Sequence, residues 1–222
     1  MRQPIKFLPY LKSTVWGGEE ISRFKGLRIN CKNIGESWEL SAVPGCESIV
    51  MDGDDCGMTL ADMVRKYKDE LVGQRVYSRY GDNFPLLVKF IDARDDLSIQ
   101  MSHLHTELAN YTYRPEVKSG YADDISDFGS GVSATESLVK SDYFQVHKEV
   151  VDGERKIRNN EDSFMGLVCI EGNGSLKVDG VSTSVKQGES LLLPAHTDEF
   201  DVEGTMALLT IVIPTLMAEA QG

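Results

Sequence analysis

Long apolar runs and basic charge are both scarce in this chain of 222 residues. No apolar run approaches the roughly 20 residues that a membrane-spanning helix needs, so we expect no membrane partner. Acidic residues outnumber basic ones by 35 to 23, which gives a formal charge of −12. Nucleic acid and anionic membranes both attract basic surfaces. The composition therefore predicts neither nucleic acid nor membrane as a partner.

Cysteine is also rare, with only Cys31, Cys46, Cys56 and Cys169. None of them forms a CxxC pair, and four cysteines in a chain of this length do not suggest a disulfide framework. We expect reduced and mostly buried thiols. Residues 1–16 have neither a continuous apolar core nor a small-residue cleavage site, so we expect no signal peptide and a cytoplasmic location.

Short β-rich runs are abundant in the last third of the chain: FMGLVCIEG, GSLKVDG, VSTSVKQG, ESLLLPA, EFDVEG and MALLTIVIP. Glycine marks the joints between them, at residues 172–174, 179–180, 187–188 and 203–204. Asp179-Gly180 suits a type I′ hairpin turn, because both central residues of that turn have positive φ. Strands at this spacing predict a jelly roll or a small barrel, and the segments EGNGSLKVDG and KQGESLLLPA resemble a cupin.

One helix is predicted in the first hundred residues, within TLADMVRKYKDELVG. Thr59 can cap its start, and Gly73 stands where it would end. The apolar residues recur at helical spacing and are expected to pack on the core; they are Leu60, Met63, Val64, Tyr67 and Leu71. The following run, FPLLVKFIDA, has the composition of a buried strand interrupted by Lys89.

Three segments of the first half, together with GESLLLPA, resemble one family. The segments are FLPYLKSTVWGGEEI, IGESWELSAVPGCES at 34–48 and GDNFPLLVKFIDARDDLSIQ at 81–100. They resemble the short bacterial form of type I mannose-6-phosphate isomerase, a cupin-type protein. The resemblance implies interconversion of mannose 6-phosphate and fructose 6-phosphate, a sugar phosphate as partner, and a divalent metal, usually zinc, in the first barrel.

The expected fold class is therefore mainly β, of the cupin jelly-roll type, also called a double-stranded β-helix. We expect a partial N-terminal barrel of the catalytic type at 1–110, with the helix inserted, and a complete C-terminal barrel at 161–216. Residues 111–160 are polar and rich in Gly and Ser. We expect them to form a loop-rich connection with a strand near 143–149.

The family's metal-site pattern is interrupted after Gln100. In the family the S-I-Q strand continues as V-H-P, whose histidine is a metal ligand, whereas Met101 and Ser102 follow here. The next segment, LHTELA, resembles a later part of full-length members. Neither a K-T-E-M-W segment with its ligand glutamate nor an A-G-x-x-H segment with its ligand histidine is present. The simplest interpretation is an internal deletion that joins two distant segments.

A second alignment places His103 in the ligand role beside Gln100, with Glu107 nearby. On a regular strand, however, Gln100 and Ser102 share one face while His103 and Glu107 share the other. Two interpretations stay open. Either Gln100 and His103 hold zinc in a rebuilt, active site, or the chain holds no metal and is a catalytically inactive cupin remnant that binds a sugar or a partner protein.

Lys89 is the candidate catalytic residue, because an ammonium group inside an apolar run must reach a cavity or a partner. A substrate-facing role and a structural ion pair with Asp92 or Glu39 both stay open. Trp16 and Glu39 are the candidate substrate-binding residues implied by the resemblance. Trp38 is a further candidate to line the first barrel.

Several other expectations concern single residues. His147 is expected to point outward from a strand, and His196 is expected in an exposed loop. Gly17 and Gly18 are expected to form a tight turn. Loss of strands from the first barrel would leave open sheet edges, which would favour a homodimer or an unstable chain.

Overall fold

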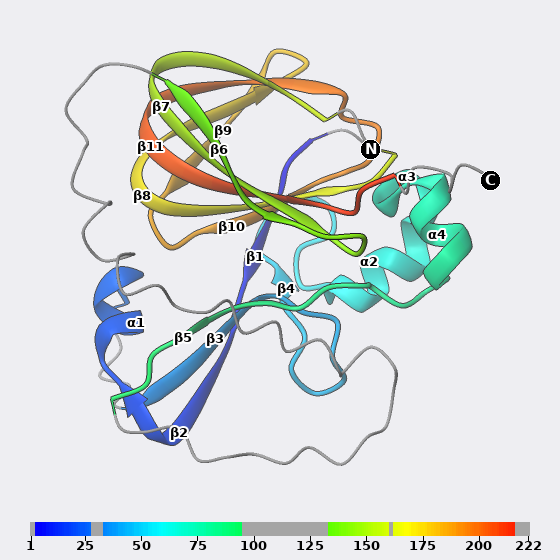
Figure 1. Cartoon of the computed structure of the whole chain (residues 1–222). Helices are drawn as coiled ribbons and strands as arrows, with labels where there is room; N and C mark the ends of the chain where they lie inside the picture. Colours follow the sequence, from blue (N-terminus) through cyan, green and yellow to red (C-terminus); the bar gives the residue numbers. More distant parts are fainter. Residues whose placement is uncertain (1–2, 28–32, 95–132, 160–161, 216–222) are drawn as a thin grey trace, which may run out of the picture.

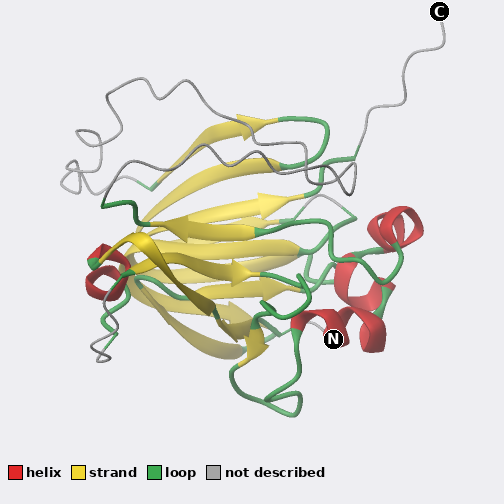
Figure 2. Cartoon of the chain, turned by 90° about the horizontal axis from the view of Figure 1, so that it is seen from below, coloured by secondary structure: helices red, strands yellow, loops and turns green. Residues whose placement is uncertain are grey.

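The computed structural model describes residues 3–27, 33–94, 133–159 and 162–215. Strands dominate these residues, so the fold is mainly β, as predicted. An eight-stranded sheet curls into the C-terminal barrel, and a three-stranded sheet lies beside it (Figure 1). Figure 2 shows a group of helices on one side of the strands and a single short helix on the opposite side.

The elements follow one another in an order that separates a mixed N-terminal half from an all-β C-terminal half. The N-terminal half contains β1 (Ile5–Leu8), β2 (Tyr10–Gly18), α1 (Glu20–Phe24), β3 (Ile34–Leu40), β4 (Ile49–Val50), α2 (Leu60–Tyr67), α3 (Asp69–Val72), α4 (Gln74–Tyr80) and β5 (Val88–Ile91). The C-terminal half contains β6 (Ala134–Lys140), β7 (Gln145–Arg158), β8 (Met165–Val178), β9 (Val181–Lys186), β10 (Ser190–Leu193) and β11 (Glu199–Val212).

The sheets do not follow the expected division of the chain. The larger sheet has the order β4-β1-β10-β8-β11-β7-β6, with β9 paired to β8, and the smaller one has the order β2-β3-β5. Strand β1 pairs antiparallel with β10, Ile5 lying opposite Leu192. The beginning of the chain is thus part of the C-terminal barrel. The predicted partial N-terminal barrel and the predicted homodimer stay predictions.

A row of glycines crosses the large sheet within its three long strands. Gly204 of β11 lies opposite both Gly153 of β7 and Gly174 of β8. A Cβ on Gly174 would collide with the Met206 methyl group and with the backbone. The expected joints at 172–174 and 203–204 are therefore wrong as strand ends: β8 and β11 each continue through them, because glycine lets the strands bend at close approach.

The expected hairpin at Asp179-Gly180 is confirmed. Asp179 has φ 49° and Gly180 has φ 81°, and the turn joins β8 to β9.

Two apolar clusters form the core. One fills the barrel between β7, β8, β9, β10 and β11, and the other lies between β1 and the helices α2, α3 and α4. Phe164, Leu192 and Ile213 from the barrel half join this second cluster, so the helices pack against one end of the barrel.

The predicted helix is confirmed in part. The Thr59 side chain accepts a hydrogen bond from the backbone N–H of Asp62 at 3.1 Å, as an N-cap does. The helix breaks at Lys68, whose φ is 49°, and resumes as α3 until Gly73, whose φ is 93°. Helix α4 then follows directly, where no helix was predicted. The apolar pattern predicts one continuous helix. The left-handed backbone conformation of Lys68 divides it into α2 and α3.

The expected loop-rich connection is wrong over its second half. The strand expected near 143–149 is present as β7 and extends to Arg158, and β6 occupies 134–140. Strand β6 stands at one end of the sheet order and is mostly exposed, so it lacks the apolar alternation that would have indicated a strand. The strand β5 is half-buried rather than buried, with Ile91 52% exposed.

Gly17 and Gly18 end β2 instead of forming a tight turn. A Cβ on Gly17 would lie 2.5 Å from the carbonyl oxygen of Asn33, and one on Gly18 would collide with the Asp92 carboxylate. That carboxylate accepts hydrogen bonds from the first backbone N–H groups of α1, including that of Glu20 at 2.6 Å. Both glycines are required by close packing between segments, not by turn geometry.

The cysteines are less buried than expected. Among the described residues Cys46, Cys56 and Cys169 are free thiols, but only Cys169 is buried; Cys31 lies outside the described residues. Burial raises the pKa of the Cys169 thiol to about 12.

In the described part of the chain, no helix is both long enough and apolar enough to cross a membrane.

Candidate functional site

Strand β3 carries polar residues on both of its faces, because successive side chains of a strand point to opposite sides. Glu36 and Trp38 share one face, and Ser37 and Glu39 share the other. Three of the four are buried, and Trp38 is half-buried. The segment ESWE therefore contributes to two separate polar groups, one on each side of the small sheet.

On the first face, four side chains form what we call the Glu36–Lys89 cluster: Lys12, Glu36, Trp38 and Lys89. Lys89 Nζ lies 3.0 Å from Glu36 Oε1, and the Trp38 indole N–H donates to Glu36 Oε2 at 2.7 Å. Lys12 Nζ lies 3.5 Å from the same Oε2. Each ammonium group is 5.4 Å from the centre of the Trp38 ring, within cation–π range.

The register of the small sheet explains why these side chains meet. Trp38 lies opposite Tyr10 of β2 and Lys89 of β5, so the three form a row across the sheet. Lys12 lies opposite Glu36 in the neighbouring row. Residues that are directly opposite in antiparallel strands share a face and touch. The cluster is thus built from three strands that come together only in the folded chain.

The electrostatics of the cluster favour an ionised Glu36. Its burial tends to raise the pKa of the carboxyl group, but the hydrogen bonds from Trp38 and Lys89 and the charges of Lys89 and Lys12 act in the opposite direction. Their sum is larger, so the pKa of Glu36 is lowered from its ordinary value. Two ammonium groups face one carboxylate, and the side chain of Lys12 is 46% exposed. The cluster therefore offers excess positive charge to an anion.

A divalent metal does not fit this cluster. Zinc takes three or four ligands from Cys, His, Asp and Glu, whereas the cluster supplies a single carboxylate that already contacts two ammonium groups. Among the residues that the structure describes, no three His, Cys, Asp or Glu side chains lie together in a way that could hold a metal ion. The predicted metal ligands Gln100 and His103 lie outside those residues.

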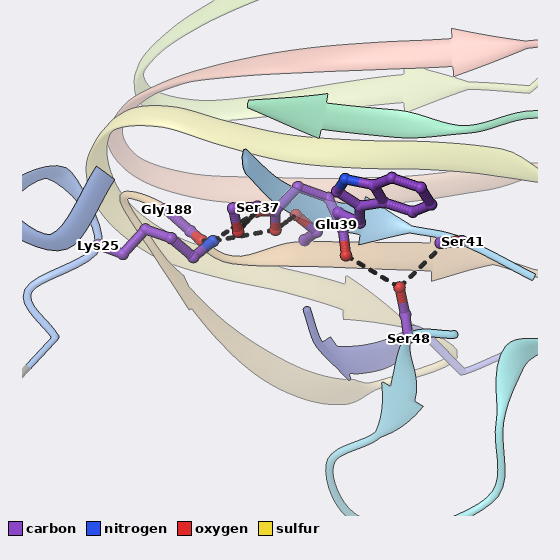
Figure 3. A network of polar contacts seen from close by, with 8 residues as sticks. Lys25, Ser37, Glu39, Ser41, Ser48 and Gly188 are labelled. Carbon is purple, nitrogen blue, oxygen red and sulfur yellow. Dashed lines mark hydrogen bonds and ion pairs between the residues drawn. The ribbon is translucent and has the colours of Figure 1, made fainter. Parts of the chain in front are cut away.

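Glu39, a predicted substrate-binding residue, lies on the opposite face of β3 in a buried network (Figure 3). Lys25 Nζ contacts its two carboxylate oxygens at 2.8 and 2.9 Å. The hydroxyl groups of Ser37 and Ser190 donate to the same carboxylate at 2.6 and 2.5 Å. Lys25 also donates to the carbonyl oxygen of Gly188. These contacts join β3 to β10, so they favour a structural role for Glu39; a substrate-binding role stays a prediction.

Lys89 takes part in an ion pair, but its partner differs from the predicted ones. Its ion pair is with Glu36, and neither Asp92 nor Glu39 takes part in it. Its side chain is 29% exposed, so the ammonium group can reach solvent. The catalytic role predicted for Lys89 stays a prediction.

Trp16 is half-buried on β2, and its ring lies against β3, where a Cβ on Gly35 would be 2.7 Å from the indole. None of the contacts described for the Glu36–Lys89 cluster involves Trp16. Its predicted role in binding substrate stays a prediction.

Two members of the cluster, Lys12 and Glu36, were missed by the sequence analysis. A signal for Glu36 was available: the spacing of two between Glu36 and Trp38 places both on one face of any regular strand. No comparable signal exists for Lys12, because its position opposite Glu36 depends on the pairing of β2 with β3.

Comparisons with known proteins agree with this architecture. Residues 5–146 match the family model "Phosphomannose isomerase type I, catalytic domain", and residues 134–213 match "Mannose-6-phosphate isomerase, cupin domain". The fold and the paired domains first define a cupin-type protein. More specifically, the chain belongs to the type I phosphomannose isomerase family, also called the mannose-6-phosphate isomerase family.

Individual relatives support the same assignment. The chain is 37% identical over 108 residues to mannose-6-phosphate isomerase ManA of Bacillus subtilis, a match that covers 49% of this chain and 32% of the relative. It is 22% identical to YvyI of Bacillus subtilis, whose assignment as a mannose-6-phosphate isomerase is itself provisional, over 94% of this chain and 98% of the relative.

Solved structures show the same fold. The mannose 6-phosphate isomerase of Salmonella typhimurium, solved with fructose 6-phosphate and zinc, superposes with a TM-score of 0.72 at 13% identity. That match covers 96% of this chain and 100% of the other. The Bacillus subtilis isomerase superposes with a TM-score of 0.61 at 18% identity, covering 95% of this chain and 99% of the other.

The match to YvyI also shows how the chain differs in length. The alignment runs over 318 positions, whereas this chain has 222 residues. At least 96 positions of the alignment, the difference between the two numbers, therefore contain no residue of this chain. An internal deletion of the kind inferred after Gln100 would produce this difference.

Proposed function

We propose that this chain binds the sugar phosphates of its family, mannose 6-phosphate and fructose 6-phosphate, at the Glu36–Lys89 cluster. One observation carries the proposal. Two ammonium groups and an indole converge on a single carboxylate, on one face of a sheet inside the segment that matches the catalytic domain. Charge-assisted hydrogen bonds from ammonium groups are a common means of holding phosphate.

Each member of the cluster has a distinct part in this proposal. Lys12 and Lys89 hold the phosphate or an adjacent hydroxyl oxygen of the sugar. Glu36 keeps Lys89 and the Trp38 indole in place, since it accepts hydrogen bonds from both. The half-exposed Trp38 ring offers an apolar face to the C–H groups of the sugar. Glu36 is already engaged by these donors, so we do not assign it the transfer of the proton.

Interconversion of the two sugars requires more than this binding site. A base must move a proton between C1 and C2, and a metal ion in the family's site stabilises the developing charge. Gln100 and His103 are the residues that would have to hold zinc in an active chain. Since the described residues do not fit a metal, we derive no catalytic step, and turnover is expected only where those two residues supply ligands.

Binding and turnover can be measured separately. Both tryptophans lie in the N-terminal half, so titration of mannose 6-phosphate followed by tryptophan fluorescence reports binding near the cluster. Replacing Lys89→Met removes one charged hydrogen-bond donor, worth roughly 1.5–3 kcal/mol, so we expect an affinity lower by about tenfold or more. Lys177→Met, an exposed lysine on β8, is the matched control and should bind as the natural chain does.

A coupled assay for fructose 6-phosphate, run with and without added zinc, tests turnover. Zinc-dependent turnover that disappears in His103→Ala would establish the rebuilt metal site. Saturable binding without turnover would identify a sugar-phosphate-binding protein. If mannose 6-phosphate produces no saturable signal, or if Lys177→Met weakens binding as much as Lys89→Met does, the proposal is wrong.

A further inference from the structure

A polar cavity of about 290 Å³ is lined by residues of β6, β7, β8 and β11. Its polar lining comes from Thr135, Gln145, His147, Glu149, Arg158, Asn159 and Thr210, and an apolar wall comes from Ile157, Met165 and Val212. None of these residues belongs to the Glu36–Lys89 cluster. The cavity is therefore a separate candidate site, in a part of the chain to which the proposed function assigns no ligand.

The direction of the β7 side chains shows that the cavity belongs to the barrel interior. Every second side chain of a strand points to the same face. Gln145, His147 and Glu149 therefore share a face of β7 with Val151, which is part of the barrel core. His147 lies opposite Thr210 of β11 and Ser137 of β6. The expectation that His147 points outward is thus wrong, because β7 has neighbours on both sides and its odd-numbered residues face the enclosed side of the sheet.

Glu149 provides a fixed hydrogen-bond acceptor at this cavity. It is only 6% exposed, and its Oε2 accepts a hydrogen bond from the Thr135 hydroxyl group at 2.7 Å and lies 3.2 Å from Arg155. Both of these contacts use Oε2, so they leave Oε1 as the oxygen with which a ligand could form a hydrogen bond. Thr135 and Arg155 hold the carboxylate in one orientation, as a binding site requires.

The charges around the cavity favour a neutral ligand. Each nearby cation is already matched by a carboxylate. Arg155 pairs with Glu149, Arg158 Nε lies 3.5 Å from Glu199, and Lys156 lies 2.9 Å from Glu199. An anion would have to compete with these carboxylates for the cations. Amide, imidazole and hydroxyl groups provide both donors and acceptors, which is what a molecule with many hydroxyl groups needs.

We propose that this cavity binds a small, neutral, polyhydroxylated molecule of monosaccharide size. Its volume is close to the lower end of the roughly 300–1,000 Å³ range of ligand pockets. Glu149 Oε1 accepts from the hydroxyl groups of the ligand, and Gln145, His147 and Thr210 complete the hydrogen bonds. The apolar wall, to which Met165 belongs, contacts the C–H groups. This inference is independent of the proposed function of the Glu36–Lys89 cluster.

Methionine methyl groups give a direct test. The full chain, labelled with ¹³C at the methionine methyl groups, is titrated with D-mannose and with D-sorbitol. We expect a saturable shift of the Met165 resonance, with no shift of Met51, which is 44% exposed and belongs to neither apolar core cluster nor to the cavity. Glu149→Gln should weaken binding about tenfold, since a hydrogen bond to a charged group is worth roughly 1.5–3 kcal/mol.

Three other variants separate binding from folding and one site from the other. Glu149→Gln leaves Arg155 without its carboxylate, so His147→Leu, at a half-buried position, provides a second and milder change that should also weaken the titration. Glu203→Gln, an exposed position on β11, is the control and should not alter it. Lys89→Met should leave the Met165 titration unchanged whether or not mannose 6-phosphate binds at the first cluster.

Three results would overturn the inference. One is the absence of a Met165 shift with either neutral probe. Another is an unchanged titration in both Glu149→Gln and His147→Leu when both variants remain folded. The third is a saturable Met165 shift with inorganic phosphate alone, which would assign the cavity to an anion.

Discussion

Glu36 shows how one carboxylate can be held ionised by its neighbours. Its burial would raise its pKa, yet hydrogen bonds from Trp38 and Lys89, with the charges of Lys89 and Lys12, lower that pKa below the ordinary 4.5. A carboxyl group with a lowered pKa in the folded state adds stability that is fully present above its unfolded pKa. That stability is lost as the pH falls through the lowered folded value. The cluster should thus be sensitive to acid.

We predict that Glu36→Gln flattens the pH dependence of the free energy of unfolding below the ordinary carboxyl pKa of 4.5, because the variant has no carboxyl group to protonate there. Urea unfolding at several pH values measures this slope. Glu203→Gln, at an exposed position, should retain the slope of the natural chain. Equal slopes for Glu36→Gln and the natural chain would show that the cluster does not stabilise the ionised carboxylate.

At the scale of elements, a row of glycines lets three long strands pack closely. Gly153, Gly174 and Gly204 lie opposite one another in the adjacent strands β7, β8 and β11. Gly174 lies so close to Met206 and to the backbone at Glu203 that a side chain there has no room.

We predict that Gly174→Ala lowers the free energy of unfolding by roughly 1–3 kcal/mol or more, because overpacking of a core typically costs that much. The nearest obstacle besides the flexible Met206 side chain is backbone, which cannot move aside cheaply. Ser175→Ala on the same strand is the control and should change stability little. Chemical denaturation of the two variants gives the comparison, and equal stabilities would contradict the assigned role of the glycine.

At the scale of the whole molecule, the buried pair Lys25–Glu39 joins the small sheet to the barrel. The two side chains are 5% and 1% exposed, and Ser37, Ser190 and Gly188 complete their hydrogen bonds (Figure 3). A buried ion pair adds little net stability over an apolar pair, but removing one partner leaves an uncompensated charge. The connection between the two sheets should therefore depend on both partners being present.

We predict that Lys25→Met lowers the free energy of unfolding by about 3–5 kcal/mol, since it leaves the Glu39 carboxylate buried without its cation. The double variant Lys25→Met, Glu39→Leu should lose less than the sum of the two single changes. Lys156→Met breaks an exposed pair with Glu199 and should change the free energy of unfolding little. Additive effects in the Lys25–Glu39 cycle would refute the coupling between the two residues.

Local patterns allowed several correct predictions where the interactions lie within a few residues of one another. The Thr59 cap and the end of the helix at Gly73 follow from backbone groups within a few residues of one another. The turn at Asp179-Gly180 requires only that both residues adopt positive φ. The family resemblance likewise rests on continuous segments, and residues 5–146 match the family's catalytic domain.

Predictions failed where the outcome depends on strand pairing. Strand β6 has no apolar alternation because it stands at the end of the sheet order, and the expectation of a loop there was wrong. His147 was expected to face outward, yet β7 turns it into the barrel between β6 and β11. Neither position can be inferred without knowing which strands are neighbours.

The chain's order of residues thus determines its β-rich character, its hairpin and capped helix, its acidic charge and its family. The tertiary structure determines which side chains meet. It places Lys89 beside Glu36, Glu39 in a buried ion pair with Lys25, and His147 inside the barrel. The physical reason is that these contacts join strands far apart in the chain, and the register of strand pairing depends on the packing of the whole sheet.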